Sequence, residues 1–301
     1  MSASDTSIDA RDWSLLGLLS VLWGGSFFFN SVVLKELPPF TLVFLRVTLA
    51  AIMLLPLLSL YRIRFPAGLP GWKPFVAIGF LNNVLPFSLI VMGQTYIPGG
   101  LASILNATTP LFTVVVMAVA GEEKLHARRI AGVVVGLIGV IILHGDGLGL
   151  ESGQGIGILL CLAAAFSYGL SALVARRLLS NAPPLGTATF QMLASAAMMT
   201  VVAGLVERPW QLPMPGAETW LAAIGLAALS TALAYIVFFQ ILRRSGATNV
   251  MLVTLLIPIT AILLGFLVLG ETISLREIAG ALVIGSALLV IDGRVLKLFQ
   301  R

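Results

Sequence analysis

Long apolar stretches, separated by short polar segments, follow one another along the whole chain. Ten of them approach or reach the roughly 20 residues with which a helix spans a membrane. They cover residues 13–34, 40–60, 72–92, 99–119, 130–143, 155–175, 187–206, 219–240, 247–269 and 278–295. The remaining segments are too short for a soluble domain of useful size. The pattern therefore predicts an all-α membrane protein of ten transmembrane helices.

The composition excludes several other classes of protein. Of the 301 residues, 58% are hydrophobic and 10% are charged, whereas an ordinary soluble domain has roughly 25% charged residues. Disordered chains are polar and rich in charge, so disorder is excluded as well. The single cysteine, Cys161, excludes a disulfide framework and a four-cysteine zinc site. We expect no cofactor, no metal ion and no nucleic-acid partner.

The distribution of Lys and Arg predicts the orientation in the membrane. With the N-terminus in the cytoplasm, the cytoplasmic side holds 14 of these 18 residues and the other side holds 3, while Arg46 lies within the second span. Such a bias is typical of cytoplasmic loops, so both termini are expected in the cytoplasm. The leader carries Asp5, Asp9 and Asp12 instead of basic residues. We therefore interpret the first span as a membrane helix and not as a cleaved signal peptide.

The two halves of the chain resemble each other. Residues 110–132 align without a gap on residues 258–280, and this alignment pairs two prolines and two glutamates. We expect two five-helix repeats, at residues 12–144 and 154–296. Because five is an odd number, the second repeat runs inverted relative to the first. Inverted repeats are typical of secondary transporters, whose substrate site lies near the membrane midplane between the halves.

Several short motifs, in a fixed order and partly duplicated, carry a resemblance to a known family. They are Leu22-Trp23-Gly24-Gly25-Ser26, Leu37-Pro38-Pro39-Phe40-Thr41 with Leu45-Arg46, Pro110 with Gly121-Glu122, and Pro258 with Leu269-Gly270-Glu271 and Ile278-Ala279-Gly280. With these motifs the chain resembles the EamA-type branch of the drug/metabolite transporter superfamily. Within it, the chain looks most similar to the YddG-type aromatic amino-acid exporters. The resemblance implies a ten-helix transporter that exports small metabolites, amino acids or drugs.

Polar and aromatic side chains in the middle of spans are the candidates for substrate binding. They are Trp23, Asn82, Asn83, Asn106, Tyr168, Thr231, Tyr235 and Thr254. An unpaired polar group is costly in hydrocarbon, so such residues tend to face a cavity or another helix. Amides can hydrogen-bond an amino or carboxylate group, and aromatic faces can stack or accept a cation. Packing between helices stays the alternative for each residue.

Two matched prolines lie mid-span, Pro110 in the fourth helix and Pro258 in the ninth. A proline leaves the carbonyl four residues earlier without its donor and kinks the helix. These carbonyls belong to Asn106 and Thr254, which are themselves polar. We predict that the two prolines are gating hinges for opposite ends of one cavity. The alternative is that prolines are simply frequent in membrane helices.

The interior of the spans lacks carboxylates and contains one arginine. All thirteen acidic residues lie in termini, in loops or at helix ends, whereas a proton-coupled cation exporter usually needs a buried carboxylate. This disfavours a small-multidrug-type mechanism and favours facilitated diffusion or exchange, with a proton route through His126 left open. Arg46 can snorkel, pair with carbonyls or bind a carboxylate, and we expect a structural role.

The sequence therefore predicts a secondary transporter in the bacterial inner membrane that exports small metabolites by alternating access, with neutral and aromatic amino acids first. Its expected partners are the bilayer and a small-molecule substrate, and a monomer and a homodimer are both open. Multidrug, lipid-linked or nucleotide-sugar transport are alternatives with the same architecture. An intramembrane enzyme is the alternative of another class, but the sequence has no His-Glu-x-x-His motif.

Overall fold

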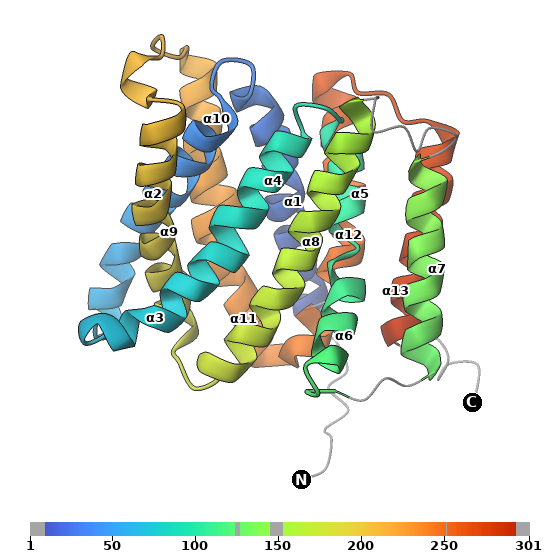
Figure 1. The fold of residues 1–301 in the computed structure, drawn as a ribbon, viewed down its shortest axis with the longest axis horizontal. Coiled ribbons are helices and arrows are strands. Elements are labelled where there is room, and N and C mark those ends of the chain that lie inside the picture. Colours follow the sequence, from blue (N-terminus) through green and yellow to red (C-terminus); the bar gives the residue numbers. More distant parts are fainter. Residues whose placement is uncertain (1–9, 124–126, 145–152, 251, 293–301) are drawn as a thin grey trace.

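A computed structural model describes residues 10–123, 127–144, 153–250 and 252–292. Within these residues all regular elements are helical, which confirms the predicted helical class (Figure 1). The α-helices are α1 (Ala10–Val33), α2 (Pro39–Leu60), α3 (Gly68–Gly79), α4 (Leu85–Gly93), α5 (Gly99–Asn106), α6 (Thr109–Val119), α7 (Ala127–His144), α8 (Gly153–Leu178), α9 (Pro184–Val206), α10 (Ala217–Ala227), α11 (Ala234–Val250), α12 (Val253–Leu264) and α13 (Leu275–Asp292). Four shorter segments are the π-helical η1 (Phe80–Val84), η3 (Ala228–Leu233) and η4 (Gly265–Leu269) and the 3-10 helix η2 (Pro209–Gln211).

Seven helices, or runs of joined helices, in the described part are long and apolar enough to cross a membrane. They are Ala10–Val33, Pro39–Leu60, Gly68–Gly93, Gly99–Val119, Gly153–Leu178, Pro184–Val206 and Ala217–Leu242. Two shorter apolar helices, Ile130–Ile142 and Val253–Leu269, fall on the predicted fifth and ninth spans. The predicted tenth span falls on α13, and the last three residues of that span lie outside the described part. His126, the candidate for a proton route, also lies outside the described part. The count of ten spans stays a prediction.

The predicted break between the eighth and ninth spans is wrong. Instead of a loop at residues 241–246, α11 continues without interruption from Ala234 to Val250. Gly246 is the only strong helix breaker in this stretch, and one glycine costs about 1 kcal/mol in a helix, which packing can offset. A contact with α1 also stabilises the extension, because Arg244 Nε donates a 3.0 Å hydrogen bond to Asp12.

Prolines begin two equivalent helices, and glycines end two equivalent spans. Pro39 and Pro184 stand in the first turns of α2 and α9, where the missing N–H is not needed and φ is already suitable. Gly121 and Gly270 have φ values of +73° and +68° directly after the fourth and ninth predicted spans. A residue with a side chain rarely adopts this conformation, so glycine is the residue that ends a helix in this way.

Two glutamates, one shortly after α1 and one directly after α9, cap helices that are distant in sequence. The Glu207 carboxylate accepts hydrogen bonds from the backbone N–H groups of Phe40 and Thr41, at 3.0 and 2.6 Å, where α2 begins. The Glu36 carboxylate accepts one from the Gly216 N–H, at 2.8 Å, before α10. The first N–H groups of a helix have no partner within it and carry positive dipole charge, so a carboxylate stabilises them. Each cap joins one half of the chain to the other.

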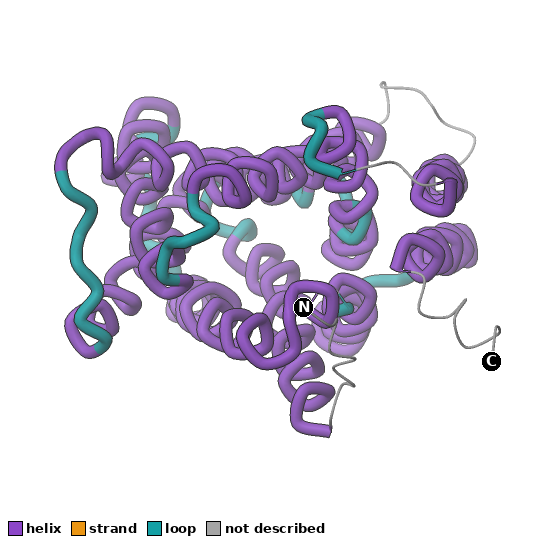
Figure 2. Tube along the Cα trace, turned by 90° about the horizontal axis from the view of Figure 1, so that it is seen from below, coloured by secondary structure: helices purple, strands orange, loops and turns teal. Residues whose placement is uncertain are grey.

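Helices of the two halves pack in corresponding ways. In the first half α1 packs against α10, α11 and α12, and in the second half α8 packs against α3, α4, α5 and α6. Three further pairs join elements at the same position of each half, namely α2 with α9, α5 with α12, and α7 with α13. The pair α7 and α13 stands to one side of the other helices in both views (Figures 1 and 2).

Small residues allow the closest of these approaches. A Cβ atom added to Gly24 of α1 would lie 3.0 Å from the carbonyl oxygen of Ile257 in α12. A Cβ added to Gly157 of α8 would lie 3.0 Å from the carbonyl oxygen of Gly93 at the end of α4. Contacts of this kind drive helix association where lipid removes the hydrophobic advantage of burying a larger side chain.

Candidate functional site

The two adjacent asparagines lie in η1, the π-helical segment between α3 and α4. The corresponding span of the second half contains a π-helical segment as well, η3, which carries Thr231. A π-helical turn is rare, and it is frequently found at functional sites. The two segments bring polar groups from both halves into the middle of the bundle.

Asn82 joins helices of both halves through its side-chain amide. Its Nδ2 donates to the Tyr235 hydroxyl at 3.0 Å and to Gln191 Oε1 at 3.3 Å. Its Oδ1 accepts a hydrogen bond from the Ser171 hydroxyl at 3.1 Å. These three partners belong to α11, α9 and α8, so one asparagine of the first half contacts three helices of the second.

Asn83 is fully buried, with 0% of its surface exposed. Its Nδ2 donates to the Ser195 hydroxyl at 3.0 Å, and its Oδ1 accepts from the Tyr235 hydroxyl at 3.4 Å. Because both ends of this amide are occupied, Asn83 positions its neighbours in this structure. Asn82 is partly exposed and keeps surface that a substrate could contact.

A buried arginine lies near Tyr168 and Tyr235. Arg46 of α2 is 7% exposed, and its Nε donates to the Thr231 hydroxyl at 3.1 Å. Its Cζ lies 3.7 Å from the centroid of the Phe87 ring, which is a cation–π contact. The Thr231 hydroxyl in turn donates to the carbonyl of Leu226 at 3.0 Å. Thr231 therefore holds the guanidinium in place, and its hydroxyl both accepts and donates a hydrogen bond within the protein.

A row of aromatic rings leads away from the amides. The Tyr235 ring stacks on Phe239 with centroids 6.0 Å apart, and Phe239 meets Phe238 edge to face at 5.2 Å. Phe238 contacts Trp23 of α1 at 5.6 Å. Tyr168 of α8 is also partly exposed and packs against both large hydrophobic clusters of the protein. The row offers aromatic faces in the interior of the bundle.

The structure thus brings together most of the predicted substrate-binding residues, but not all. Asn82, Asn83 and Tyr235 belong to one hydrogen-bonded cluster. Thr231 is hydrogen-bonded to Arg46, which lies near Tyr168 and Tyr235, and Trp23 is connected to Tyr235 through the aromatic row. We call these six predicted residues, together with Arg46, Phe87, Ser171, Gln191 and Ser195, the central cluster. Among the described residues, no hydrogen bond or ring contact ties Asn106 to it. Thr254 lies half-buried near the start of α12.

The two predicted hinges differ in their local structure. Pro110 stands in the first turn of α6, directly after the break that separates α5 from α6. The carbonyl of Asn106, which lacks its usual donor, accepts a hydrogen bond from the Thr109 hydroxyl at 2.7 Å. Pro258 lies inside α12, which continues on both sides of it. The hinge function of both prolines stays a prediction.

Sequence reasoning missed the partners that complete the central cluster. Gln191 and Ser195 are spaced i, i+4 on α9, and Tyr235, which was predicted, has the same spacing to Phe239 on α11. Residues at this spacing share one face of a helix. This periodicity was a signal in the sequence, but only the fold shows that the faces meet.

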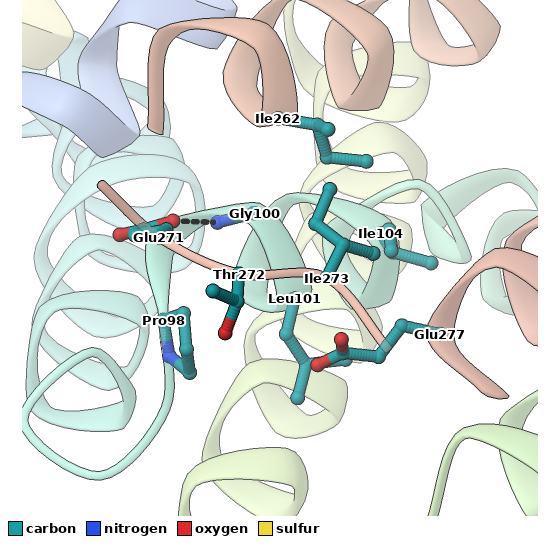
Figure 3. Close-up of a pocket in the computed structure, with 9 residues that line it drawn as sticks. All are labelled: Pro98, Gly100, Leu101, Ile104, Ile262, Glu271, Thr272, Ile273 and Glu277. Atoms are coloured by element: carbon teal, nitrogen blue, oxygen red, sulfur yellow. Dashed lines mark hydrogen bonds between the residues drawn. The ribbon is translucent and has the colours of Figure 1, made fainter. Parts of the chain in front are cut away.

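A second polar contact closes the upper end of the bundle. Glu271 accepts hydrogen bonds from the N–H groups of Gly99 and Gly100, at 3.2 and 3.3 Å, where α5 begins (Figure 3). A small hollow beside it has a volume of about 10 Å³, which is the space of roughly one water molecule. The hollow is too small for a metabolite, and Glu271 joins the two halves beside it.

The comparisons with known proteins agree with this architecture. The EamA-like transporter family matches residues 12–144 and residues 155–291 of the chain. The chain belongs to the EamA-like transporter family. It is therefore a transporter and not an enzyme.

Curated relatives of this EamA-like transporter share about a quarter of its residues over most of their length. A probable amino-acid metabolite efflux pump of Salmonella typhimurium is 27% identical over 93% of this chain and 94% of its own. The uncharacterized transporter YoaV of Bacillus subtilis is 25% identical over 90% and 93%, and the inner membrane transporter YedA of Escherichia coli is 26% identical over 92% and 90%. With the apolar helices, these relatives support a multi-pass integral membrane protein in the bacterial inner membrane.

A solved crystal structure of another protein has the same fold. It aligns with a TM-score of 0.68 over 96% of this EamA-like chain and 99% of its own, at 20% sequence identity. At this identity the likeness concerns the fold alone.

Proposed function

We propose that this EamA-like protein exports small metabolites, with neutral and aromatic amino acids first, by alternating access. The observation that carries the proposal is the central cluster, in which amide, hydroxyl, guanidinium and aromatic groups of both halves meet inside an apolar bundle. Asn82, Tyr168, Tyr235 and Trp23 keep part of their surface exposed there. The amide and guanidinium groups suit the polar head of an amino acid, and the rings suit its side chain. The suspected relationship to the YddG-type aromatic exporters and the efflux pump named among the relatives point the same way.

The packing of the helices supports two inverted repeats of five spans each, at residues 12–144 and 154–296. Equivalent spans contact each other as expected for a two-fold axis in the membrane plane, and both the third and the eighth spans contain a π-helical segment. In addition, α1 begins at the same end of the bundle at which α13 ends (Figure 1). This agrees with an even number of spans and with both termini on one side. The excess of Lys and Arg that the sequence predicts on the side of the termini supports a cytoplasmic location for this end.

The contacts of the fourth span support a state that is closed toward the outside. Its upper half, α5, packs against α12 and is capped by Glu271 of the other half. Its lower half, α6, packs chiefly against α8 and α7. If the two halves rock around the central cluster, the contact between α5 and α12 must open in the outward-facing state. Glu271 and the hinge at Pro110 lie at the places where this opening would occur.

The charges of the described interior favour amino acids over the alternative substrates. Among the residues of the central cluster, all of which lie in the described part, Arg46 is the only one with a charged side chain, and its charge is positive. It would repel cationic drugs, and a single cation is a weak match for the several charges of a nucleotide sugar. Coupling by facilitated diffusion or exchange fits an interior cluster without a carboxylate. A monomer is sufficient for this mechanism, because the cluster lies within one chain.

The proposal is tested by substrate flux in proteoliposomes that contain the purified chain. The panel pairs labelled neutral, aromatic, acidic and basic amino acids with cationic drugs, each with and without an imposed pH gradient. Saturable flux of neutral or aromatic amino acids that does not respond to the pH gradient is expected. Flux of drugs alone would contradict the substrate class. Flux that collapses without the gradient would contradict the coupling.

A further inference from the structure

The guanidinium of Arg46 is buried in the central cluster without a negative partner among the described residues. Arg46 is 7% exposed, and it lies within the membrane span formed by α2. Its protein contacts in the described part are the hydrogen bond from Nε to Thr231 and the Phe87 ring. A buried charge is costly unless it is paired and hydrogen-bonded. The site thus supplies a positive charge that the described protein does not neutralise.

The geometry leaves one side of the guanidinium for a ligand. An arginine has five N–H donors, of which one belongs to Nε and four to the two terminal nitrogens. The Nε donor is used by Thr231, and none of the described residues accepts a hydrogen bond from the other four. Thr231 and the Phe87 ring fix the group from two directions, so its orientation does not depend on a ligand. It is held ready for an acceptor.

The free edge of the guanidinium matches a carboxylate. Two parallel N–H groups of an arginine can bind the two oxygens of a carboxylate in a fork. The single positive charge of the arginine then neutralises the single negative charge of the carboxylate. A phosphate ester or diphosphate would bring more negative charge than this single cation neutralises. The partly exposed rings of Tyr168 and Tyr235 are close enough to Arg46 to interact with it electrostatically. An apolar or aromatic group attached to the carboxylate would meet these rings and the row behind Tyr235.

We propose that Arg46 binds the carboxylate of the transported substrate, so that the site selects monocarboxylates and rejects the corresponding amides and amines. This deepens the proposed function and rests on it for the identity of the site. It replaces the structural role expected for Arg46 from the sequence. The packing of Arg46 against Phe87 and Thr231 serves to position the charge, and the four remaining donors serve to bind.

The test compares ligands that differ only in their polar head. Flux of labelled L-phenylalanine is measured in proteoliposomes with the full chain, with unlabelled L-phenylalaninamide, 3-phenylpropionate and phenethylamine as competitors. Hydrogen bonds to charged groups contribute about 1.5–3 kcal/mol, so removal of the carboxylate is expected to weaken competition roughly tenfold to a hundredfold. 3-Phenylpropionate should compete, whereas the amide and the amine should compete more weakly by this factor. Equal competition by phenylalanine and phenylalaninamide would overturn the proposal.

Variants assign the selectivity to Arg46. In Arg46→Met the preference for the acid over the amide should fall toward one, and in Arg46→Lys a reduced preference should remain because the charge is kept and the fork is lost. Arg64→Met, at an exposed arginine before α3, is the matched control and should keep the wild-type preference. If Arg46→Met does not fold, the preference for the acid over the amide is still compared between the wild type and Arg46→Lys, and this comparison tests the proposal. Wild-type selectivity in Arg46→Lys or Arg46→Met would overturn the proposal.

Failure of the carboxylate site and failure of the proposed function give different results. If phenylalanine and its amide are transported equally well, the result supports amino-acid export and contradicts the carboxylate site. A second outcome is that no amino acid is transported, while radiolabelled 3-phenylpropionate binds the purified wild type but not Arg46→Met. This result would support the carboxylate site and contradict amino-acid export. If neither phenylalanine nor 3-phenylpropionate binds, the carboxylate site is overturned.

Discussion

Asn82 in the first half of the chain donates a 3.0 Å hydrogen bond to the hydroxyl of Tyr235 in the second half. The same hydroxyl lies 3.4 Å from Asn83 Oδ1, to which it donates. The phenol therefore bridges two neighbouring amides of η1. A rocking motion between the halves must stretch or exchange these bonds. Their strength contributes to the free-energy difference between the two states of the transporter.

Removal of this hydroxyl should change transport without unfolding the protein. In Tyr235→Phe the ring can still stack on Phe239, while two hydrogen bonds between the halves are lost. One hydrogen bond contributes about 0.5–1.5 kcal/mol, so the loss of both is expected to change the KM for flux by up to roughly a hundredfold. The measurement is the concentration dependence of flux in proteoliposomes. Tyr96→Phe, at a half-exposed tyrosine between α4 and α5, is the control, and an unchanged KM in Tyr235→Phe would contradict the bridge.

Two adjacent glycines of α1 should differ in their tolerance of a methyl group. A Cβ on Gly24 would press into Thr260 and approach the Ile257 carbonyl of α12, whereas the first atom that a Cβ on Gly25 would meet is 3.8 Å away. Overpacking typically destabilises by about 1–3 kcal/mol. We expect Gly24→Ala to lower the thermal midpoint in detergent and Gly25→Ala to leave it unchanged. Equal midpoints for the two variants would show that α1 and α12 separate at little cost.

The cap formed by Glu36 should make stability depend on acidity. Hydrogen bonds from the Thr219 hydroxyl and from the Gly216 N–H lower the pKa of Glu36 below its ordinary value of 4.5. A carboxyl with a lowered pKa stabilises the folded state above its unfolded pKa, and this contribution is lost as the pH falls through the folded pKa. The window thus lies below pH 4.5. When the pH is lowered through this window, the thermal midpoint of the wild type should therefore fall further than that of Glu36→Gln.

Other carboxylates titrate in the same range, so the comparison needs a control. Glu218→Gln removes an exposed carboxylate that lies 4.0 Å from Lys35, and such surface pairs contribute little to stability. Its pH profile should follow that of the wild type. If Glu36→Gln also follows the wild type, the cap does not contribute to the acid dependence.

Apolar length and helix-ending residues were enough to predict most elements of the fold. Pro39 and Pro184 mark the starts of two helices, and the predicted spans fall on the observed helices because hydrocarbon requires every backbone group to be paired within its segment. The end of α11 was missed because its stabilising contact, between Arg244 and Asp12, is between residues distant in sequence. The π-helical form of η1 was likewise not visible in the residues Asn82 and Asn83.

The central cluster was predictable in its members but not in their roles. Polar residues in apolar spans are conspicuous, so Asn82 and Tyr235 could be named from the sequence. Whether such a residue contacts a substrate or another helix depends on partners from other spans. Thr231 illustrates this, because its hydroxyl is used by Arg46 and by Leu226 and so serves to position the guanidinium. The lack of an acidic partner for Arg46 in the described part is likewise a property of the fold.

The last prediction concerns the matched prolines. In Pro110→Ala the residue gains an N–H that can donate to the Asn106 carbonyl, which now accepts from Thr109. The break between α5 and α6 could then close into one continuous and stiffer helix. If the break lets the upper half of the span move separately, flux should fall while the thermal midpoint stays the same or rises. Pro258→Ala should likewise impair flux more than folding, because a proline in a helix weakens it locally.

Pro56→Ala provides the matched control, since Pro56 lies inside a membrane helix, α2, but outside the matched pair. Its flux should remain near that of the wild type. Flux is compared at equal amounts of reconstituted protein, and thermal midpoints are measured on the same preparations. Wild-type flux in both Pro110→Ala and Pro258→Ala would exclude the hinge function. A loss of flux in all three variants would instead show that any mid-helix proline is needed, and that the symmetry of the pair has no part in gating.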